Sequence, residues 1–280
     1  MADRRAASAL RAAARAGAAG PKRLPRGRHK LDPVQVAASQ RARLFSAMAS
    51  VTAAKGYAAT TVADLLAAAG VSRETFYEQF RSKLDCFEQA FHDASVLLFA
   101  VVAQSAAAGG GAPGDEPPGR GAGLGSPATQ ASRSQERTRR GEPARRGVGA
   151  EAEVGAEGKA GVEEEVGERA RRERRVERFE GFLAAYLDAL ASYPDLARLC
   201  LVEVYAAGPD LARRRAEVQE RFAVQVEKLL GARDDDARFA CQALVAAIGA
   251  MTTARLAVGD VDGLRALQRP LVTLVRNALR

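Results

Sequence analysis

The chain has 280 residues, a formal net charge of +8 and no tryptophan, and only 5% of its residues are aromatic. Much of its apolar content is alanine, which favours helices over β-sheets. No run approaches the roughly 20 apolar residues that a membrane-spanning helix needs, and no apolar signal segment begins the chain. We therefore expect an all-α, cytoplasmic protein without a membrane partner. Cys86, Cys200 and Cys241 are predicted to be free, buried thiols.

The positive charge is concentrated at the start of the chain. Residues 1–30 hold nine Arg or Lys side chains and only one acidic residue, Asp3, so this segment carries the whole net charge. Its Ala, Arg and Gly content, together with Pro21 and Pro25, is typical of a disordered basic arm. Residues 31–92 hold six basic and six acidic side chains, so we expect a neutral domain to follow a basic arm.

A first helix is predicted from Asp32 to Gly56. Asp32 has the position of an N-cap, and Pro33 follows in the first turn, where its missing N–H is not needed. The apolar residues that recur on one side of this helix are Leu44, Phe45, Met48 and Val51.

Two short helices are predicted on either side of Gly70. Thr61 and Asp64 have the spacing of a capping box at the start of the first, and Gly70 suits its left-handed C-cap. Ser72 is a natural N-cap for the second helix, which runs to about Phe80. Two helices joined by a short turn make a helix-turn-helix, whose second helix can lie in the DNA major groove.

The second of these helices supplies the predicted DNA-reading surface. Phe76 and Phe80 lie one turn apart and define its buried side, so the polar residues between them point outward. Ser82 and Asp85 form a further capping box that places Lys83 at a helix N-terminus, which suits a phosphate. The predicted DNA-binding residues are Thr61, Ser72, Arg73, Glu74, Thr75, Tyr77, Gln79, Arg81 and Lys83.

The residue pattern of this segment closely resembles a known family. The first helix ends in KGY, and TTV-x-D, AGVS, TFYEQF and SK follow as in the DNA-binding domain of the TetR/AcrR transcriptional regulators. The resemblance covers residues 31–92 and departs from the family pattern at Thr52, where a Phe is usual, and at Leu66, where a small residue is usual. It implies a three-helix DNA-binding domain joined to a helical regulatory domain that dimerises through its terminal helices.

A further helix is predicted from Lys83 to about Ala108, with a break near His92. Residues 109–175 then hold 15 of the 26 glycines, 5 of the 11 prolines and almost no large apolar side chains. Such a segment buries too little surface to offset the entropy of ordering its backbone, so we predict a disordered insertion. The charge blocks of residues 163–178 also allow a solvated extension of the next helix.

Helical periodicity returns at Val176. Helices are predicted over 176–193, 196–207, 210–230, 237–258 and 261–279, the last kinked at Pro270. Residues 93–108 and 176–280 together would form a helical ligand-binding and dimerisation domain. The last two helices expose more apolar surface than one small domain can bury, so we expect them to form a homodimer interface.

No constellation of catalytic residues, metal ligands or phosphate-binding glycines is recognisable in the sequence. We therefore expect neither an enzyme nor a bound cofactor or metal. Polar residues among apolar neighbours in the C-terminal half are instead candidates for a small-molecule pocket. These candidates are Tyr186, Glu203, Tyr205 and Met251.

Together with these patterns, the resemblance to the TetR/AcrR regulators implies a homodimeric, nucleoid-associated DNA-binding regulator, a repressor that an unknown small molecule releases from a palindromic operator. One alternative is a helix-turn-helix recombinase or transposase, which would need an acidic cluster or a nucleophile in a separate folded domain. A second is a helical sensor or adaptor without DNA binding. Glu74 and Glu78 favour it, because carboxylates repel phosphate unless they accept from a cytosine N4.

Overall fold

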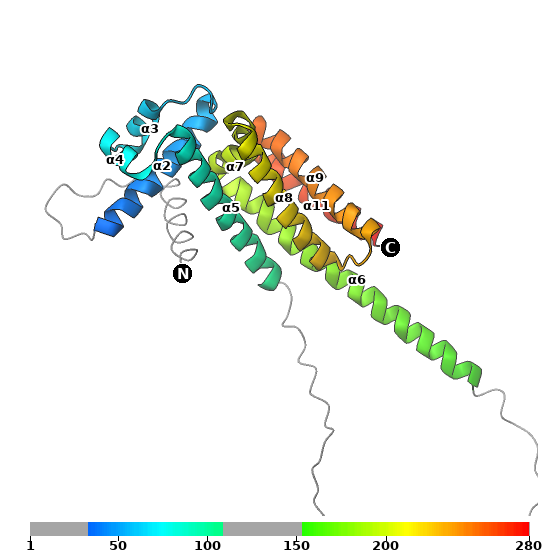
Figure 1. Ribbon diagram of the computed structural model, residues 1–280. Helices are drawn as coiled ribbons and strands as arrows, with labels where there is room; N and C mark the ends of the chain where they lie inside the picture. The colour runs from blue at the N-terminus through cyan, green and yellow to red at the C-terminus, as the bar shows by residue number, and fades with distance from the viewer. Residues whose placement is uncertain (1–32, 109–152, 280) are drawn as a thin grey trace, which may run out of the picture. The chain divides into compact units, whose positions relative to one another are not determined.

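The computed structural model describes residues 33–108 and 153–279, with side chains over 34–104 and 165–279. Every regular element of this described part is a helix, in the order α2 to α11 (Figure 1). The predicted all-α fold class is therefore confirmed. The basic arm, the predicted N-cap Asp32 and residues 109–152 lie outside the described residues, so the predictions made for them stay predictions.

Three helices and the start of a fourth form the first part of the fold. They are α2 (Pro33–Lys55), α3 (Val62–Ala69), α4 (Arg73–Gln79) and the N-terminal turns of α5 (Lys83–Ala108). Their shared core consists of Leu44, Phe45, Met48, Leu65, Phe76, Phe80 and Phe87. Thr52, where the family usually has a Phe, is fully buried, and its hydroxyl donates to the Met48 carbonyl at 2.7 Å. The substitution is tolerated because the helix backbone satisfies the buried hydroxyl.

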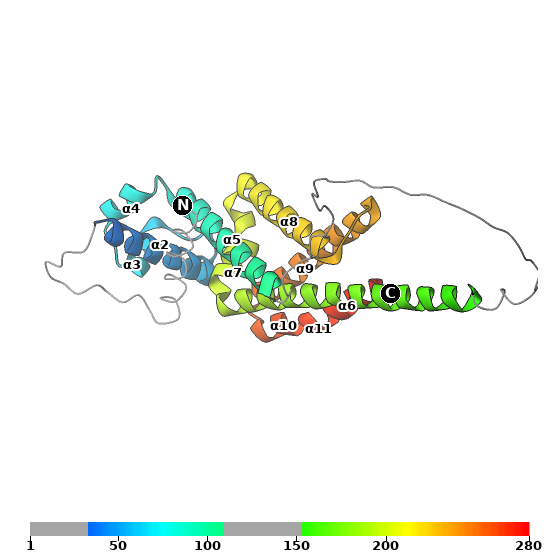
Figure 2. The ribbon, with the colours of Figure 1, turned by 90° about the horizontal axis from the view of Figure 1, so that it is seen from below.

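The remaining helices form the second part of the fold together with the rest of α5. They are α6 (Glu153–Ser192), α7 (Pro194–Leu201), the 3₁₀ helix η1 (Glu203–Ala207), α8 (Pro209–Leu230), α9 (Asp235–Ala257), α10 (Val261–Ala266) and α11 (Gln268–Ala278). Helices α8 and α9 lie side by side (Figure 1). Figure 2 shows α10 and α11 against α6, where Arg265 lies 3.9 Å from Asp188 and Arg276 lies 3.9 Å from Glu173.

Two predictions for the chain on either side of residues 109–152 differ from the structure. Helix α5 has no break near His92, because His92 lies on an exposed side and Phe91, Ser95 and Leu98 continue the inward face. Residues 153–175, predicted to be disordered, belong to α6, which begins at Glu153, and the alternative of a solvated helical extension over 163–178 is confirmed. The Glu, Arg and Ala residues of this stretch are strong helix formers, and they outweigh its four glycines.

Two C-terminal helices also differ from their predicted form. The segment expected to be one helix over 196–207 ends its α-helix at Leu201 and tightens into η1, which turns Glu203 into the protein interior. The last predicted helix is divided into α10 and α11 at Leu267 rather than kinked at Pro270. Proline lacks the N–H that would bond one turn back, so the interruption falls before it and α11 begins with Pro270 in its first turn.

Two of the described helical stretches are long and apolar enough to cross a membrane by length and composition alone. They are Lys83–Gln104 within α5 and all of α9. Because the buried helices of other proteins pass the same test, this finding by itself assigns neither stretch to a membrane.

Candidate functional site

The two helices of the helix-turn-helix are fixed by their caps. Thr61 and Asp64 form the predicted capping box, with the Thr61 N–H donating to Asp64 Oδ2 at 2.7 Å. Gly70 is left-handed, at φ 63°, and its N–H returns to the Leu66 carbonyl at 2.9 Å. Ser72 Oγ accepts from the Thr75 N–H at 3.1 Å and starts α4. Local sequence therefore sets the angle at which α4 leaves the turn.

Helix α4 presents a polar surface opposite its buried aromatic side. Phe76 and Phe80 are at most 1% exposed, and their ring centroids lie 5.5 Å apart. Thr75 and Gln79 are half-buried at the edges of this surface. Its exposed members are Ser72, Arg73, Glu74, Tyr77, Glu78 and Arg81. Guanidinium, hydroxyl and carboxylate groups gathered on one short helix can serve as partners for base edges and phosphates.

Tyr77 is the large aromatic residue of this surface, and half of it is exposed. Its ring meets the Phe76 ring edge-on, with centroids 5.3 Å apart. The core therefore holds the Tyr77 ring in place from beneath. A phenol supported in this way can donate to a phosphate oxygen with little loss of conformational entropy.

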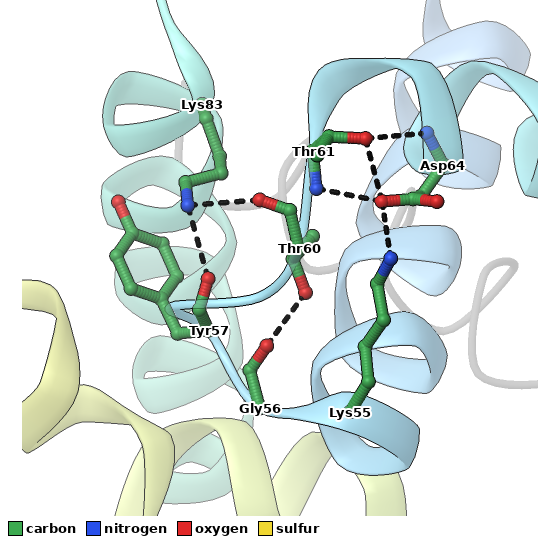
Figure 3. A network of polar contacts seen from close by, with 7 residues as sticks. All are labelled: Lys55, Gly56, Tyr57, Thr60, Thr61, Asp64 and Lys83. Atoms are coloured by element: carbon green, nitrogen blue, oxygen red, sulfur yellow. Dashed lines mark hydrogen bonds and ion pairs between the residues drawn. The ribbon is translucent and has the colours of Figure 1, made fainter.

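Lys83, predicted to contact phosphate, is largely engaged inside the domain (Figure 3). Its ammonium donates to the carbonyls of Tyr57 at 3.0 Å and of Thr60 at 2.9 Å, and it lies 4.1 Å from the centre of the Tyr57 ring. Partial burial lowers the pKa of this amine. Two of its three N–H groups thus tie the α2–α3 connection to the start of α5.

Thr61 is engaged in the same way. Its hydroxyl donates to Asp64 Oδ2 at 2.6 Å, and the same carboxylate pairs with Lys55 (Figure 3). These contacts hold the pKa of Asp64 well below its usual range, with the Lys55 hydrogen bond contributing most. Thr61 and Lys83 therefore position the helices that carry the exposed residues of α4.

The sequence reasoning missed two arginines of α2 that hold the domain together. Arg43 Nη1 donates to the Ala69 carbonyl at 3.1 Å and so closes the C-terminus of α3. The Arg41 guanidinium lies 4.8 Å from the centre of the Phe45 ring and also lies over Phe80. The i,i+4 spacing of Arg41 and Phe45 was a signal that could have found the second contact.

A cavity of about 50 Å³ lies among α5, α6, α8 and α9, and its walls are mainly aromatic and aliphatic. Tyr186, one of the four predicted pocket residues, lines it. The charged residue on its wall is Arg215, which sequence reasoning missed because it stands in the run Arg213 to Arg215 of a strongly charged helix. A larger and more open groove of about 410 Å³ lies between α5, α6 and α7.

The other three predicted pocket residues lie elsewhere. Tyr205 is 59% exposed on η1 and Met251 is 45% exposed on α9, because the rotation of each helix turns its side chain outward. Glu203 is buried, but it faces the connection between α2 and α3, where Oε2 accepts from the Tyr57 N–H at 2.9 Å. For these residues, apolar neighbours in the sequence were a poor guide to where the side chain points.

Glu203 is part of a polar chain that reaches from α9 to the α2–α3 connection. Its Oε1 lies 3.5 Å from Arg198 Nε. Arg198 Nη1 in turn donates to the carbonyls of Leu256 at 3.1 Å and Ala257 at 2.8 Å, at the end of α9. Residues far apart in sequence thus connect the two parts of the fold through Tyr57.

Residues 44–90 match the sequence model of the family "Bacterial regulatory proteins, tetR family". Comparison with curated proteins gives no match. Among solved structures, the fatty acid degradation regulator FadR from Bacillus halodurans is similar at a TM-score of 0.52 and 17% identity, over 85% of this chain and 98% of that one. A TetR-like transcriptional regulator from Rhodococcus sp. RHA1 is similar at 0.52 and 15%, over 89% of this chain and 96% of that one. The helix-turn-helix is thus a tetR-family DNA-binding domain, within a fold shared with TetR-like regulators.

Proposed function

We propose that this chain, which carries a tetR-family DNA-binding domain, is a cytoplasmic, homodimeric transcriptional repressor that a small molecule releases from a palindromic operator on the nucleoid. The observation that carries the DNA-binding part is the family match at residues 44–90 together with the exposed polar surface of α4. In this proposal Arg73, Thr75, Tyr77, Gln79 and Arg81 contact DNA. Thr61 and Lys83 act beneath them, through the contacts that hold α3 and α5.

An exposed apolar stripe on α9 supports the homodimer. Phe239 is 71% exposed, and exposed alanines follow it at helical spacing. The alanines are Ala243, Ala246, Ala250 and Ala254. Small side chains let a second helix approach closely, and a twofold axis would place this stripe against its own copy. Helix α11 adds a smaller contribution, with Leu274 at 56% exposure.

Helix α5 supplies a route from a ligand to the DNA-binding domain. Its middle turns line the cavity through Phe91, Ser95 and Leu98, and its first turn holds the α2–α3 connection through Lys83. A ligand that prefers one position of α5 therefore also prefers one position of α3 and α4. Such a preference shifts the population of the dimer toward or away from the separation that DNA requires.

Selection of bound duplexes from a random library by the full-length chain tests the proposal. We expect twofold symmetric sites whose half-site centres lie about one helical turn, ~34–36 Å, apart, because a twofold dimer reads twofold DNA. Light scattering on the same sample measures the mass and should give that of a dimer. A monomer that selects single, unsymmetric half-sites would refute the dimeric part. A library without enrichment would refute DNA binding itself.

A further inference from the structure

Arg215 is a buried cation without an anion. It is 7% exposed, its Nε has no hydrogen-bond partner, and its Nη1 makes one long contact of 3.4 Å with Gln219 Oε1. Among the residues that the structure describes, no carboxylate lies within salt-bridge distance of it, whereas the neighbouring Arg214 lies 3.8 Å from Glu88 at the surface. A guanidinium surrounded by apolar walls is strongly unfavourable unless something pairs with it.

The two titratable groups on the cavity wall that interact electrostatically with Arg215 are neutral. Burial raises the pKa of the Cys200 thiol to about 12, so this thiol carries no negative charge near neutral pH. Burial also raises the pKa of the Tyr186 phenol, whose hydroxyl is already hydrogen-bonded to Thr252. Among the described residues of the cavity wall, neither a thiolate nor a phenolate pairs with Arg215, which leaves room for an anion from outside.

The shape of the space limits what that molecule can be. A cavity of about 50 Å³ has room for roughly four water-sized groups, enough for a carboxylate and little more. The groove of about 410 Å³ shares Leu98 and Cys200 with the cavity, so these two side chains form the partition between them. The groove is largely apolar, and its carboxylate Asp188 lies 3.9 Å from Arg265.

We propose that Arg215 binds the carboxylate of an amphipathic monocarboxylic acid whose narrow, unbranched apolar body passes between Leu98 and Cys200 into the groove between α5, α6 and α7. A guanidinium matches a carboxylate with two parallel hydrogen bonds. A phosphate dianion would leave a second charge without a partner, because Arg215 is the only charged residue described on the cavity wall. The assignment rests on the proposed function, since it names the ligand that acts on α5.

Calorimetric titration of the full-length chain, without DNA, tests the assignment. The probes are decanoate below its micellar concentration, and 1-decanol and decyl phosphate, which share its apolar body. The variants are Arg215→Gln and the matched Arg214→Gln, which removes the same charge from the helix surface. We expect decanoate to bind the native chain and Arg214→Gln alike, and Arg215→Gln about 10- to 100-fold more weakly. Ala185→Trp, which fills the groove but not the cavity, should weaken the binding of decanoate more than the binding of hexanoate, whose apolar body is shorter.

Each outcome decides one point. Equal binding of decanol and decanoate, or equal binding by Arg215→Gln and the native chain, overturns the assignment. Tighter binding of decyl phosphate overturns the choice of a monoanion. If Arg215→Gln fails to fold, Arg215→Lys, which keeps the charge but loses the bidentate geometry, should bind decanoate with intermediate affinity. Operator release is measured separately, so decanoate that binds through Arg215 without releasing DNA refutes the regulatory function and leaves the site standing.

Discussion

Replacing Glu203 by alanine should loosen the α2–α3 connection at one backbone amide. In the structure, the Tyr57 N–H has Glu203 Oε2 as its hydrogen-bond acceptor, at 2.9 Å, and Glu203 is only 7% exposed. Removing a buried, charge-assisted hydrogen bond costs about 1.5–3 kcal/mol. Arg198 Nη1 keeps its hydrogen bonds to the Leu256 and Ala257 carbonyls after this change, so we take a cost of about 2 kcal/mol, within that range. Hydrogen exchange at the Tyr57 amide should therefore accelerate about 30-fold.

Glu203→Gln separates the hydrogen bond from the charge. It keeps an acceptor for the Tyr57 N–H but loses the pairing with Arg198, so we expect an acceleration of about five-fold, or ~1 kcal/mol. Glu220→Ala removes an exposed carboxylate from α8 and is the matched control. The Gly56 amide, which bonds to the Thr52 carbonyl at 2.8 Å, reports whether the change is local. Unchanged exchange at Tyr57 in Glu203→Ala, or the same change in Glu220→Ala, would show that Glu203 does not hold this connection.

Three further predictions concern the helix-turn-helix domain and the basic arm before it. Lys83→Ala should lower the free energy of unfolding, measured by urea denaturation, by about 1–2 kcal/mol, because the Tyr57 and Thr60 carbonyls lose their donor. Arg73→Ala should leave this free energy unchanged and instead relax the preference for particular bases by about 1–3 kcal/mol. Because its folded pKa is lowered, the Asp64 carboxylate stabilises the fold above the ordinary carboxyl pKa of about 3.9, and this stabilisation is lost as the pH falls through the folded value. The melting-temperature difference between native and Asp64→Asn chains should therefore shrink below pH 4. Removing residues 1–28, which carry most of the net charge, should flatten the slope of log K against log salt for operator and random DNA alike.

Features that depend on a few neighbouring residues could be predicted from the sequence. The Thr61–Asp64 box, the left-handed Gly70 and the Ser72 cap are confirmed, because each needs only residues within one helical turn. The start of α6 could not be placed, since glycine content and helix-forming charged residues gave opposite indications over residues 153–175. The partner of Glu203 was also out of reach. Glu203 meets a backbone amide 146 residues away, and no local pattern encodes such a contact.

Tyr57 is one residue at which the two parts of the fold meet. Glu203 accepts from its N–H and Lys83 donates to its carbonyl, so the two peptide groups that flank Tyr57 contact η1 and the first turn of α5. The chain continues from Tyr57 directly into the capping box of α3, which sets the direction of α4. A molecule that separates α5 from α8 at Arg215 would pull on the carbonyl side of Tyr57, while Arg198 holds Glu203 to the end of α9. We therefore expect a shift of α5 that leaves η1 and α9 in place to change the tilt of α3 and α4 relative to the proposed dimer interface, and an operator of fixed half-site spacing would detect this change.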